Sequence, residues 1–310
     1  MTRAGFAAVI GAPNAGKSTL VNRLVGAKVS IVTRKVQTTR FPVRGVAMEG
    51  ESQIVLVDTP GVFSPRRRLD RAMVRAAWTG ADEADVVVHL VDAEAELAVS
   101  ENKATPAQNR CAIDAATILE RLQASGTKAI LALNKVDMVK REKLLALADT
   151  LFASGAYSEV FMISAETGSG VDRLKTRLAE LMPESPWLYP EDQTADLPVR
   201  LLAAEITREK IYLRVHEELP YAAAVETTAF KEAKGGAARI EQTIYVERES
   251  QRPIVLGKDG QTLKWIGQKS REELIEILGR PVHLFLTVKV VEGWQDKRDF
   301  YRDTGLEYDS

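Results

Sequence analysis

The segment that most constrains this chain is a glycine-rich turn that follows an apolar run near the N-terminus. The run covers residues 6–10, and the turn Gly-Ala-Pro-Asn-Ala-Gly-Lys-Ser extends from Gly11 to Ser18. It fits the pattern GxxxxGK[ST], in which backbone N–H groups and a helix N-terminus surround a polyphosphate. The pattern assigns Lys17 to the β- and γ-phosphates and the Ser18 hydroxyl to Mg²⁺. The expected phosphate-binding residues are Gly11, Ala12, Pro13, Asn14, Ala15, Gly16, Lys17, Ser18 and Thr19.

A second polar motif, Asn134-Lys135-Val136-Asp137, follows the apolar run 128–133. Polar groups at the carboxyl end of a buried strand lie where open α/β sheets bind ligands. The carboxylate of Asp137 can accept hydrogen bonds from the N1–H and 2-amino groups of guanine, whereas adenine has no donor at either place. A site built on such pairing can discriminate by about 10⁴-fold, so the motif predicts GTP rather than ATP. We expect Asn134 to brace neighbouring loops and the stem of Lys135 to cover the base.

The base pocket is completed by a third motif, residues 164–166, which follows the apolar run 160–163. We expect the backbone N–H of Ala165 to be available to the guanine O6. A fourth motif, DTPG at residues 58–61, follows an apolar strand and is typical of a γ-phosphate sensor. The nucleotide-binding residues expected from these motifs are Asp58, Thr59, Pro60, Gly61, Asn134, Lys135, Asp137, Ser164, Ala165 and Glu166.

The magnesium ligands are predicted from three separate segments. Asp58 stands opposite Ser18, and the polar stretch at residues 37–40 can add a threonine hydroxyl when the third phosphate is present. We favour Thr39, with Thr38 as the second choice. The expected Mg²⁺ ligands are Ser18, Thr39 and Asp58, and the expected catalytic residues are Lys17, Thr39 and Gly61.

Patterning divides the chain into two domains. Residues 5–182 alternate short apolar runs with helical patterns, which is typical of a mostly parallel sheet with helices on both faces. Within them, we expect 93–106 to be a surface loop or an extra helical turn. Four prolines punctuate residues 183–198 and predict a linker. We therefore expect domains at 1–182 and 199–310, joined by that linker.

The second domain contains a GxxG loop, Gly257-Lys258-Asp259-Gly260, between an apolar helical turn and a predicted helix at 261–278. In a KH module two such glycines let the backbone approach about four nucleotides of a single strand. The formal net charge of −1 gives no overall footprint for nucleic acid, so the basic charge must be local. The expected RNA-binding residues are Gly257, Lys258, Asp259, Gly260, Lys264, Lys269 and Arg271.

Taken together, these motifs resemble the five signature motifs of translation-factor-class GTPases, and nearly the whole chain is similar to the Era family of bacterial GTPases. The resemblance implies a P-loop GTPase domain followed by an α+β type II KH domain. It implies GTP hydrolysis, binding to the 3′ end of 16S rRNA and assistance in assembly of the 30S subunit. It also implies a cytoplasmic protein, which in some relatives touches the inner membrane peripherally. We expect a monomer.

The residue at one position of this chain differs from the one that many small GTPases have there. Val62 follows the DTPG motif where a glutamine would orient the attacking water, so we expect a slow basal rate. Several related GTPases with an apolar residue here use K⁺ held partly by the phosphate-loop asparagine, and Asn14 matches that position. Two interpretations stay open, because Asn14 can instead only brace the loop. We interpret the basic run 66–68 after the sensor as a solvated face by default, and a contact for RNA or for the second domain is the alternative.

Two other functions compete with the GTPase reading. One is an RNA-binding scaffold with a structural nucleotide site and little turnover, against which the intact Lys17, Ser18, Asp58 and Asp137 argue. The other is a phosphotransferase, against which Asp137 and the absence of an evident acceptor-binding base argue. Measured turnover and nucleotide selectivity separate the three.

Overall fold

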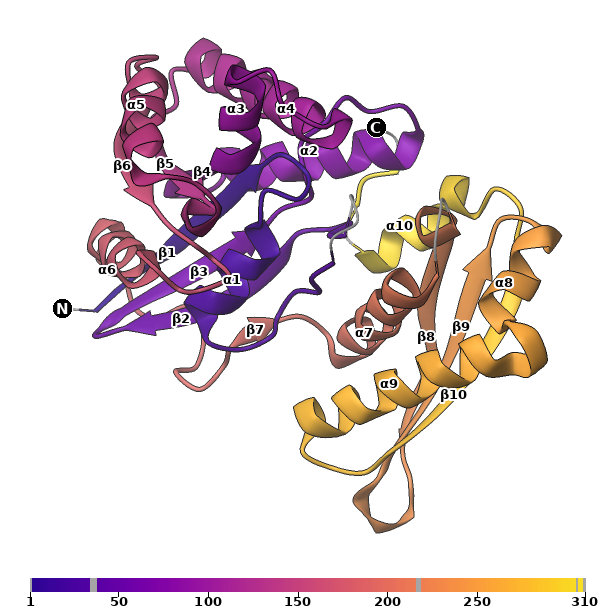
Figure 1. Cartoon of the computed structure of the whole chain (residues 1–310). Helices are drawn as coiled ribbons and strands as arrows, with labels where there is room; N and C mark the ends of the chain where they lie inside the picture. Colours follow the sequence, from indigo (N-terminus) through magenta and orange to yellow (C-terminus); the bar gives the residue numbers. More distant parts are fainter. Residues whose placement is uncertain (1, 34–37, 216–218, 305, 309–310) are drawn as a thin grey trace. The chain divides into compact units, whose positions relative to one another are not determined.

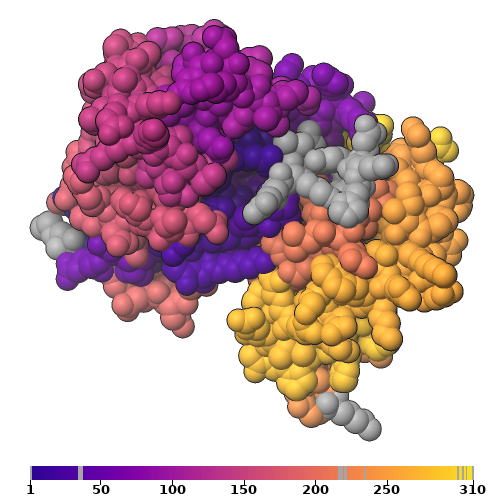
Figure 2. All heavy atoms as spheres, viewed as in Figure 1, coloured from indigo at the N-terminus to yellow at the C-terminus, as the bar shows by residue number. Residues whose placement is uncertain are grey.

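The structure is a computed structural model of the chain, and it describes residues 2–33, 38–215, 219–304 and 306–308. The other residues are grey in Figures 1 and 2. The chain divides into two compact units. The first comprises Met1–Asp196 and Leu306–Ser310, and the second comprises Leu197–Gly305.

A twisted sheet forms the centre of the first unit (Figure 1). Its order in the described residues is β6-β5-β4-β1-β3-β2-β7, and β1, β3, β4, β5 and β6 pair in parallel, whereas β2 pairs antiparallel with β3 and with β7. The strands are β1 (Arg3–Gly11), β2 (Val43–Glu49), β3 (Ser52–Asp58), β4 (Val86–Asp92), β5 (Ala129–Asn134), β6 (Tyr157–Met162) and β7 (Ala195–Asp196). Strand β5 lies between β4 and β6 and is buried along its whole length, as a parallel strand covered on both faces must be.

Helices cover both faces of this sheet (Figure 1). Apolar residues of α1 and α6 pack on one face, and those of α2, α4 and α5 pack on the other. The helices are α1 (Lys17–Val25), α2 (Arg68–Asp82), α3 (Ala93–Ser100), α4 (Pro106–Ser125), α5 (Arg141–Phe152) and α6 (Val171–Leu181). The segment 93–106, expected as a loop or helical turn, contains the eight-residue helix α3, because Asp92 caps it by accepting a hydrogen bond from Ala95 N at 3.1 Å.

The proline-rich segment expected as a linker lies against the first unit. Oε1 of Gln53 accepts hydrogen bonds from the backbone N–H groups of Leu188 and Tyr189 at 2.8 and 3.0 Å, and Gln53 Nε2 donates to Tyr189 O at 2.8 Å. The segment then adds β7 to the sheet by pairing with β2. Its prolines prevent a helix but leave donors and acceptors that the edge of the sheet can bind.

The second unit packs helices on one face of a three-stranded sheet of order β10-β9-β8. Strands β8 and β9 are antiparallel, and β9 and β10 are parallel. Its elements are α7 (Val199–Arg214), η2 (Leu219–Ala222), β8 (Ala223–Glu232), η3 (Lys234–Gly236), β9 (Ala238–Val246), η4 (Glu249–Gln251), α8 (Arg252–Leu256), η5 (Lys258–Gly260), α9 (Gln261–Leu278), β10 (Val282–Val290), η6 (Trp294–Asp296) and α10 (Arg298–Thr304).

This order of elements, with the GxxG turn between α8 and α9, is that of the type II KH fold. No helix in the described ranges is long and apolar enough to cross a membrane.

Candidate nucleotide and RNA sites

The phosphate loop connects β1 to α1 and encloses the ammonium of Lys17. Lys17 Nζ donates hydrogen bonds to Gly11 O at 3.2 Å and to Ala12 O at 2.9 Å, and the side chain is buried. Burial lowers the pKa of Lys17 to about 8, although the carboxylate of Asp58 opposes the shift. A polyphosphate beside this ammonium would favour its charged form, because an opposite charge nearby does so.

Two glycines permit close approaches that a larger residue would prevent. Gly16 has φ 101°, and a Cβ there would lie 2.4 Å from Nδ2 of Asn134. At Gly61, a Cβ would lie 2.9 Å from Cγ and 3.0 Å from Cα of Pro13. The sensor motif and the base motif therefore both lie directly against the phosphate loop.

The three expected magnesium ligands converge. Ser18 Oγ donates to Asp58 Oδ2 at 2.8 Å, Thr39 Oγ1 donates to the same oxygen at 3.2 Å, and the two hydroxyl oxygens are 2.9 Å apart. Thr38, the second choice, instead lies with its Oγ1 2.7 Å from that of Thr33. The structure thus joins Thr39, not Thr38, to the other two groups.

Asp58 has the character of a metal-binding carboxylate. It is fully buried, and burial raises its pKa against the opposing effects of Lys17 and of the hydrogen bonds from Ser18 and Thr39. Its Oδ1 has no hydrogen-bond partner in the described part of the chain. An orphaned oxygen beside two hydroxyls suits a hard cation with its water shell, because Mg²⁺ takes oxygen ligands.

Asn134 links the phosphate loop to the third base motif. Its Nδ2 donates to Ala15 O at 2.7 Å, and its Oδ1 accepts from Ala165 N at 2.9 Å. These two hydrogen bonds are the bracing geometry expected of Asn134. The Ala165 N–H expected to be available to guanine O6 donates to Asn134 in this structure, because the two loops pack within hydrogen-bonding distance.

The remaining base residues are placed around this brace. Lys135 has φ 64° and its ammonium pairs with Asp92, while Asp137 is exposed. The hydroxyl of Ser164 is buried and accepts a hydrogen bond from Thr167 N at 3.1 Å. The carboxylate of Asp137 is thus open to solvent at the carboxyl end of β5, where a base can reach it.

Sequence reasoning missed Arg23 on α1. Its guanidinium donates to the backbone oxygens of Ala165, at 3.3 Å, and of Glu166. An arginine in the last turn of a short helix carries no motif, and only the packing of α1 beside residues 164–166 gives it this role. It holds the loop at the edge of the base pocket.

The position after DTPG carries no polar side chain. Val62 is buried, and its backbone N–H donates to Gly11 O at 3.1 Å. Asn14 is exposed with φ 63°, a conformation that asparagine tolerates better than most residues. This conformation fits both interpretations of Asn14.

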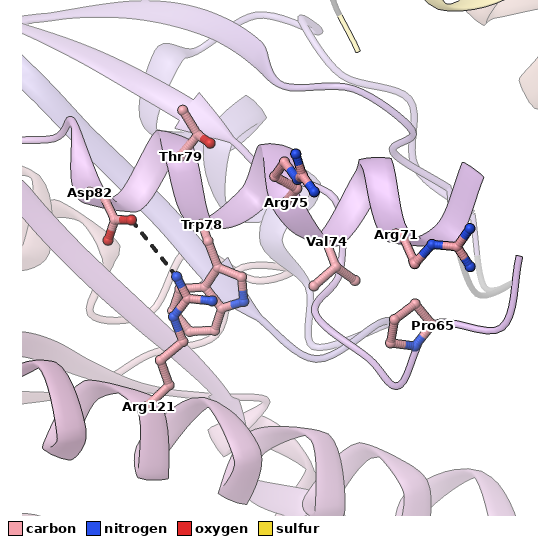
Figure 3. A pocket seen from close by; sticks show the side chains of 8 residues that line it. All are labelled: Pro65, Arg71, Val74, Arg75, Trp78, Thr79, Asp82 and Arg121. Carbon is pink, nitrogen blue, oxygen red and sulfur yellow. Dashed lines mark ion pairs between the residues drawn. The ribbon is translucent and has the colours of Figure 1, made fainter. Parts of the chain in front are cut away.

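A separate cavity of about 420 Å³ lies between α2 and α4 (Figure 3), and none of its lining residues belongs to a nucleotide motif. Arg121 lies over the Trp78 ring at 3.9 Å and pairs with Asp82 at 3.8 Å. The cavity is lined by Pro65, Arg71, Val74, Arg75, Trp78, Thr79, Asp82 and Arg121.

The GxxG loop has the backbone conformation that its glycines allow. Gly257, Asp259 and Gly260 have φ of 74°, 52° and 74°. A Cβ at Gly257 would lie 2.2 Å from Thr262 Oγ1, whereas one at Gly260 would meet no atom within 4 Å. The loop therefore presents an open backbone at Gly260, directly before the N-terminus of α9.

The expected basic residues of this unit are all exposed: Lys258, Lys264, Lys269 and Arg271. Lys269 pairs with Glu272 at 2.7 Å. Ile266 is fully buried, and the half-buried Trp265 packs against the same apolar cluster, with the Arg214 guanidinium 5.6 Å above its ring. Both residues thus pack in the core of this unit.

Comparison with known proteins finds a family match in each of the two units. A family model described as 50S ribosome-binding GTPase matches residues 6–135, and one described as KH domain matches residues 218–295. GTPase Era of Caulobacter vibrioides is 71% identical over 308 residues, which cover 99% of this chain and 98% of that protein. GTPase Era of Maricaulis maris is 61% identical over 307 residues, with coverage of 99% and 98%.

Two solved structures match along nearly the whole chain. One is a crystal structure of Aquifex aeolicus Era bound to GDP·AlF4⁻, with a TM-score of 0.88, 38% identity, and coverage of 98% of this chain and 99% of that one. The other is Era in complex with MgGDPNP and nucleotides 1506–1542 of 16S ribosomal RNA, with a TM-score of 0.88, 37% identity and the same coverage.

Proposed function

This chain belongs to the Era family of GTPases, and from that premise we propose that it hydrolyses GTP and binds 16S rRNA through its KH unit in assembly of the small ribosomal subunit. The observation that carries the proposal is the convergence of Ser18, Thr39 and Asp58 beside the ammonium of Lys17. A phosphate loop with this hydroxyl–carboxylate cluster is suited to a magnesium-bound nucleotide.

Mg²⁺ would be held by Ser18, Thr39 and, through its orphaned oxygen or a water, Asp58. When bound, it neutralises charge that develops on the β- and γ-phosphate oxygens. Lys17 contributes a second positive charge from the phosphate loop. Gly61, which packs against Pro13, would offer its backbone N–H to the γ-phosphate. The relative solved with MgGDPNP binds the same kind of ligand.

Turnover should be slow without further help. The apolar side chain of Val62 can neither donate nor accept a hydrogen bond, so it cannot orient the attacking water. We propose that K⁺ near Asn14 supplies part of the missing charge stabilisation. Asn14→Gly tests this, because glycine keeps the positive φ and removes the amide.

The GTPase experiment compares phosphate release in K⁺ and Na⁺ at equal ionic strength. Wild type should be faster in K⁺, and Asn14→Gly should lose the difference while still binding GTP. Equal rates of wild type in the two salts reject the K⁺ role. No turnover in either salt, with GTP still bound, favours the alternative of an RNA-binding scaffold.

The RNA proposal rests on the GxxG geometry and on the relative solved with a 16S rRNA segment. The description of the matching GTPase model names the 50S subunit, but 16S rRNA belongs to the small subunit, so we propose the 30S subunit as partner. We further propose that the protein acts in the cytoplasm as a monomer, with peripheral contact to the inner membrane.

A matched pair of variants at Gly260 tests RNA binding. Asparagine and aspartate both tolerate positive φ, and no atom blocks a side chain there. Gly260→Asp should weaken binding to a single-stranded fragment of the 16S rRNA 3′ end at least tenfold, whereas Gly260→Asn should weaken it far less, because only aspartate repels phosphate. Equal affinities for both variants and wild type would remove the loop from the interface.

A further inference from the structure

The last residues of the chain belong to the first unit, although the residues before them belong to the second. The chain leaves the first unit after Asp196 and returns to it at Leu306. The two units are therefore joined covalently at two places. The second crossing ends on a defined surface of the first unit.

That surface is one face of α2, the helix that follows the sensor motif. Leu306 is buried, Glu307 Oε2 pairs with Arg75 Nη1 at 3.1 Å, and the Arg68 guanidinium lies 4.6 Å above the ring of Tyr308. Arg68 and Arg75 are two helical turns apart and share a face of α2. An acidic residue and an aromatic residue thus each meet an arginine of the same helix.

The start of α2 is tied to the segment that leads from the sensor. Asp70 Oδ2 accepts hydrogen bonds from the backbone N–H groups of Arg66 and Arg67 at 3.1 and 3.0 Å. Upstream, Val62 N donates to the phosphate loop at Gly11 O. The segment between the sensor and α2 is thus hydrogen-bonded to the phosphate loop at one end and to α2 at the other. If the γ-phosphate displaces the sensor, α2 should therefore move with it.

We propose that Leu306, Glu307 and Tyr308 form a strap docked on α2. In this proposal the nucleotide state regulates RNA binding by changing how tightly α2 binds the strap. The proposal rests on the proposed function, since it names how the nucleotide and RNA sites of that function communicate. It requires α2 to hold the strap more tightly in one nucleotide state, because equal affinity for both states shifts nothing.

The contacts set the scale of the effect. The Arg75 and Glu307 side chains are 52% and 70% exposed, so water and salt screen their attraction. An exposed ion pair together with a cation–π contact corresponds to a difference of about three- to tenfold in an equilibrium constant. We expect the strap to change the ratio of RNA affinities between GDP and a GTP analogue by this amount.

The first experiment is a charge-reversal cycle on the full chain. The measured quantity is the ratio of the Kd for the 16S rRNA 3′ fragment with GDP to that with a non-hydrolysable GTP analogue. Glu307→Arg and Arg75→Glu should each move this Kd ratio about three- to tenfold towards one. The double variant, in which the two charges are exchanged, should return the ratio to the wild-type value. Tyr308→Ala should act like the single reversals, whereas Tyr308→Phe keeps the ring and should resemble wild type.

The second experiment observes the strap without RNA. Backbone amide exchange of residues 306–308 should differ between the GDP and analogue states in wild type and become fast in both for Glu307→Arg. Equal exchange in wild type, or an affinity ratio that no strap variant changes, overturns the proposal. Both outcomes leave GTP hydrolysis and RNA binding measurable in the same samples. Loss of either activity in wild type would instead count against the proposed function.

Discussion

At the scale of single residues, the nucleotide site depends on side chains that serve two loops at once. Asn134 bonds both the phosphate loop and Ala165, and Asp58 accepts from two hydroxyls. Asp137 differs from them, because it is exposed. It can therefore be changed without disturbing the fold, which isolates base recognition from stability.

We predict that Asp137→Asn exchanges guanine for xanthine. The asparagine side chain lacks the second oxygen that accepts a hydrogen bond from the 2-amino group of guanine. In its place it has an amide N–H that can donate a hydrogen bond to the 2-oxo group of xanthine. The variant should lose GTP affinity by about 10³-fold or more and gain affinity for XTP. Competition of GTP and XTP for a fluorescent nucleotide measures both, and unchanged GTP preference would remove Asp137 from the base site.

The ammonium of Lys17 predicts a pH dependence of GTP affinity. Its pKa is lowered to about 8 by burial, so the nucleotide-free protein holds neutral Lys17 above that pH. Because the phosphates bind the charged form, affinity should be flat below pH 8 and fall towards tenfold per pH unit above it. Calorimetry in buffers of different ionisation enthalpy should detect proton uptake on binding at pH 9 and none from Lys17 at about pH 7.

The lowered pKa of Lys17 also makes the free energy of unfolding depend on pH. Between the lowered pKa and the ordinary value for lysine, the unfolded chain binds more protons than the folded one. The contribution of Lys17 to the free energy of unfolding therefore rises with pH across that window and is constant below it.

At the scale of elements, residues 183–196 belong to the first unit and end in β7, the strand that pairs with β2. The buried Gln53 at the start of β3 supplies the acceptor and donor that fix this segment. Asp58 lies at the other end of the same strand. The segment and the nucleotide site can thus be perturbed independently.

We predict that Gln53→Met destabilises the first unit by about 1–3 kcal/mol, because two backbone N–H groups and one carbonyl lose their partner. Chemical denaturation should show the loss, and limited proteolysis should cut within residues 186–196 faster than in wild type. GTP affinity should stay within about twofold, since Gln53 is remote from the phosphate loop along β3. Resistance to proteolysis equal to wild type would show that Gln53 does not anchor the segment.

At the scale of the whole molecule, a net charge of −1 means that RNA affinity has to come from a local group of cations. The basic residues around the GxxG loop are exposed and few. Lys269 already pairs with Glu272. Long-range attraction to RNA should therefore be weak, and selectivity should come from the loop backbone.

This predicts a shallow salt dependence. With three or four cations on a single strand, the slope of log K against log salt should lie between about −2 and −3, and Lys264→Gln should reduce its magnitude by about 0.7. Anisotropy titrations of a labelled rRNA fragment at several salt concentrations measure the slope. A much steeper slope would point to basic residues outside the KH unit.

The sequence alone determined the strand–loop–helix of the phosphate site, the motif that selects guanine and the GxxG loop, because each depends on residue types within a few positions of one another. The resemblance to the Era family instead covers nearly the whole chain. It also favoured Thr39 over Thr38, and the structure joins Thr39 to Ser18 and Asp58.

Only the tertiary structure decided that Ala165 N–H meets Asn134, that Arg23 holds the same loop, that residues 183–196 belong to the first unit, and that Glu307 reaches Arg75. The physical reason is sequence separation. Each contact joins segments far apart in the chain, for example 232 residues for Arg75 and Glu307, and carries no local pattern. Such contacts exist only once the sheet and helices bring their partners together.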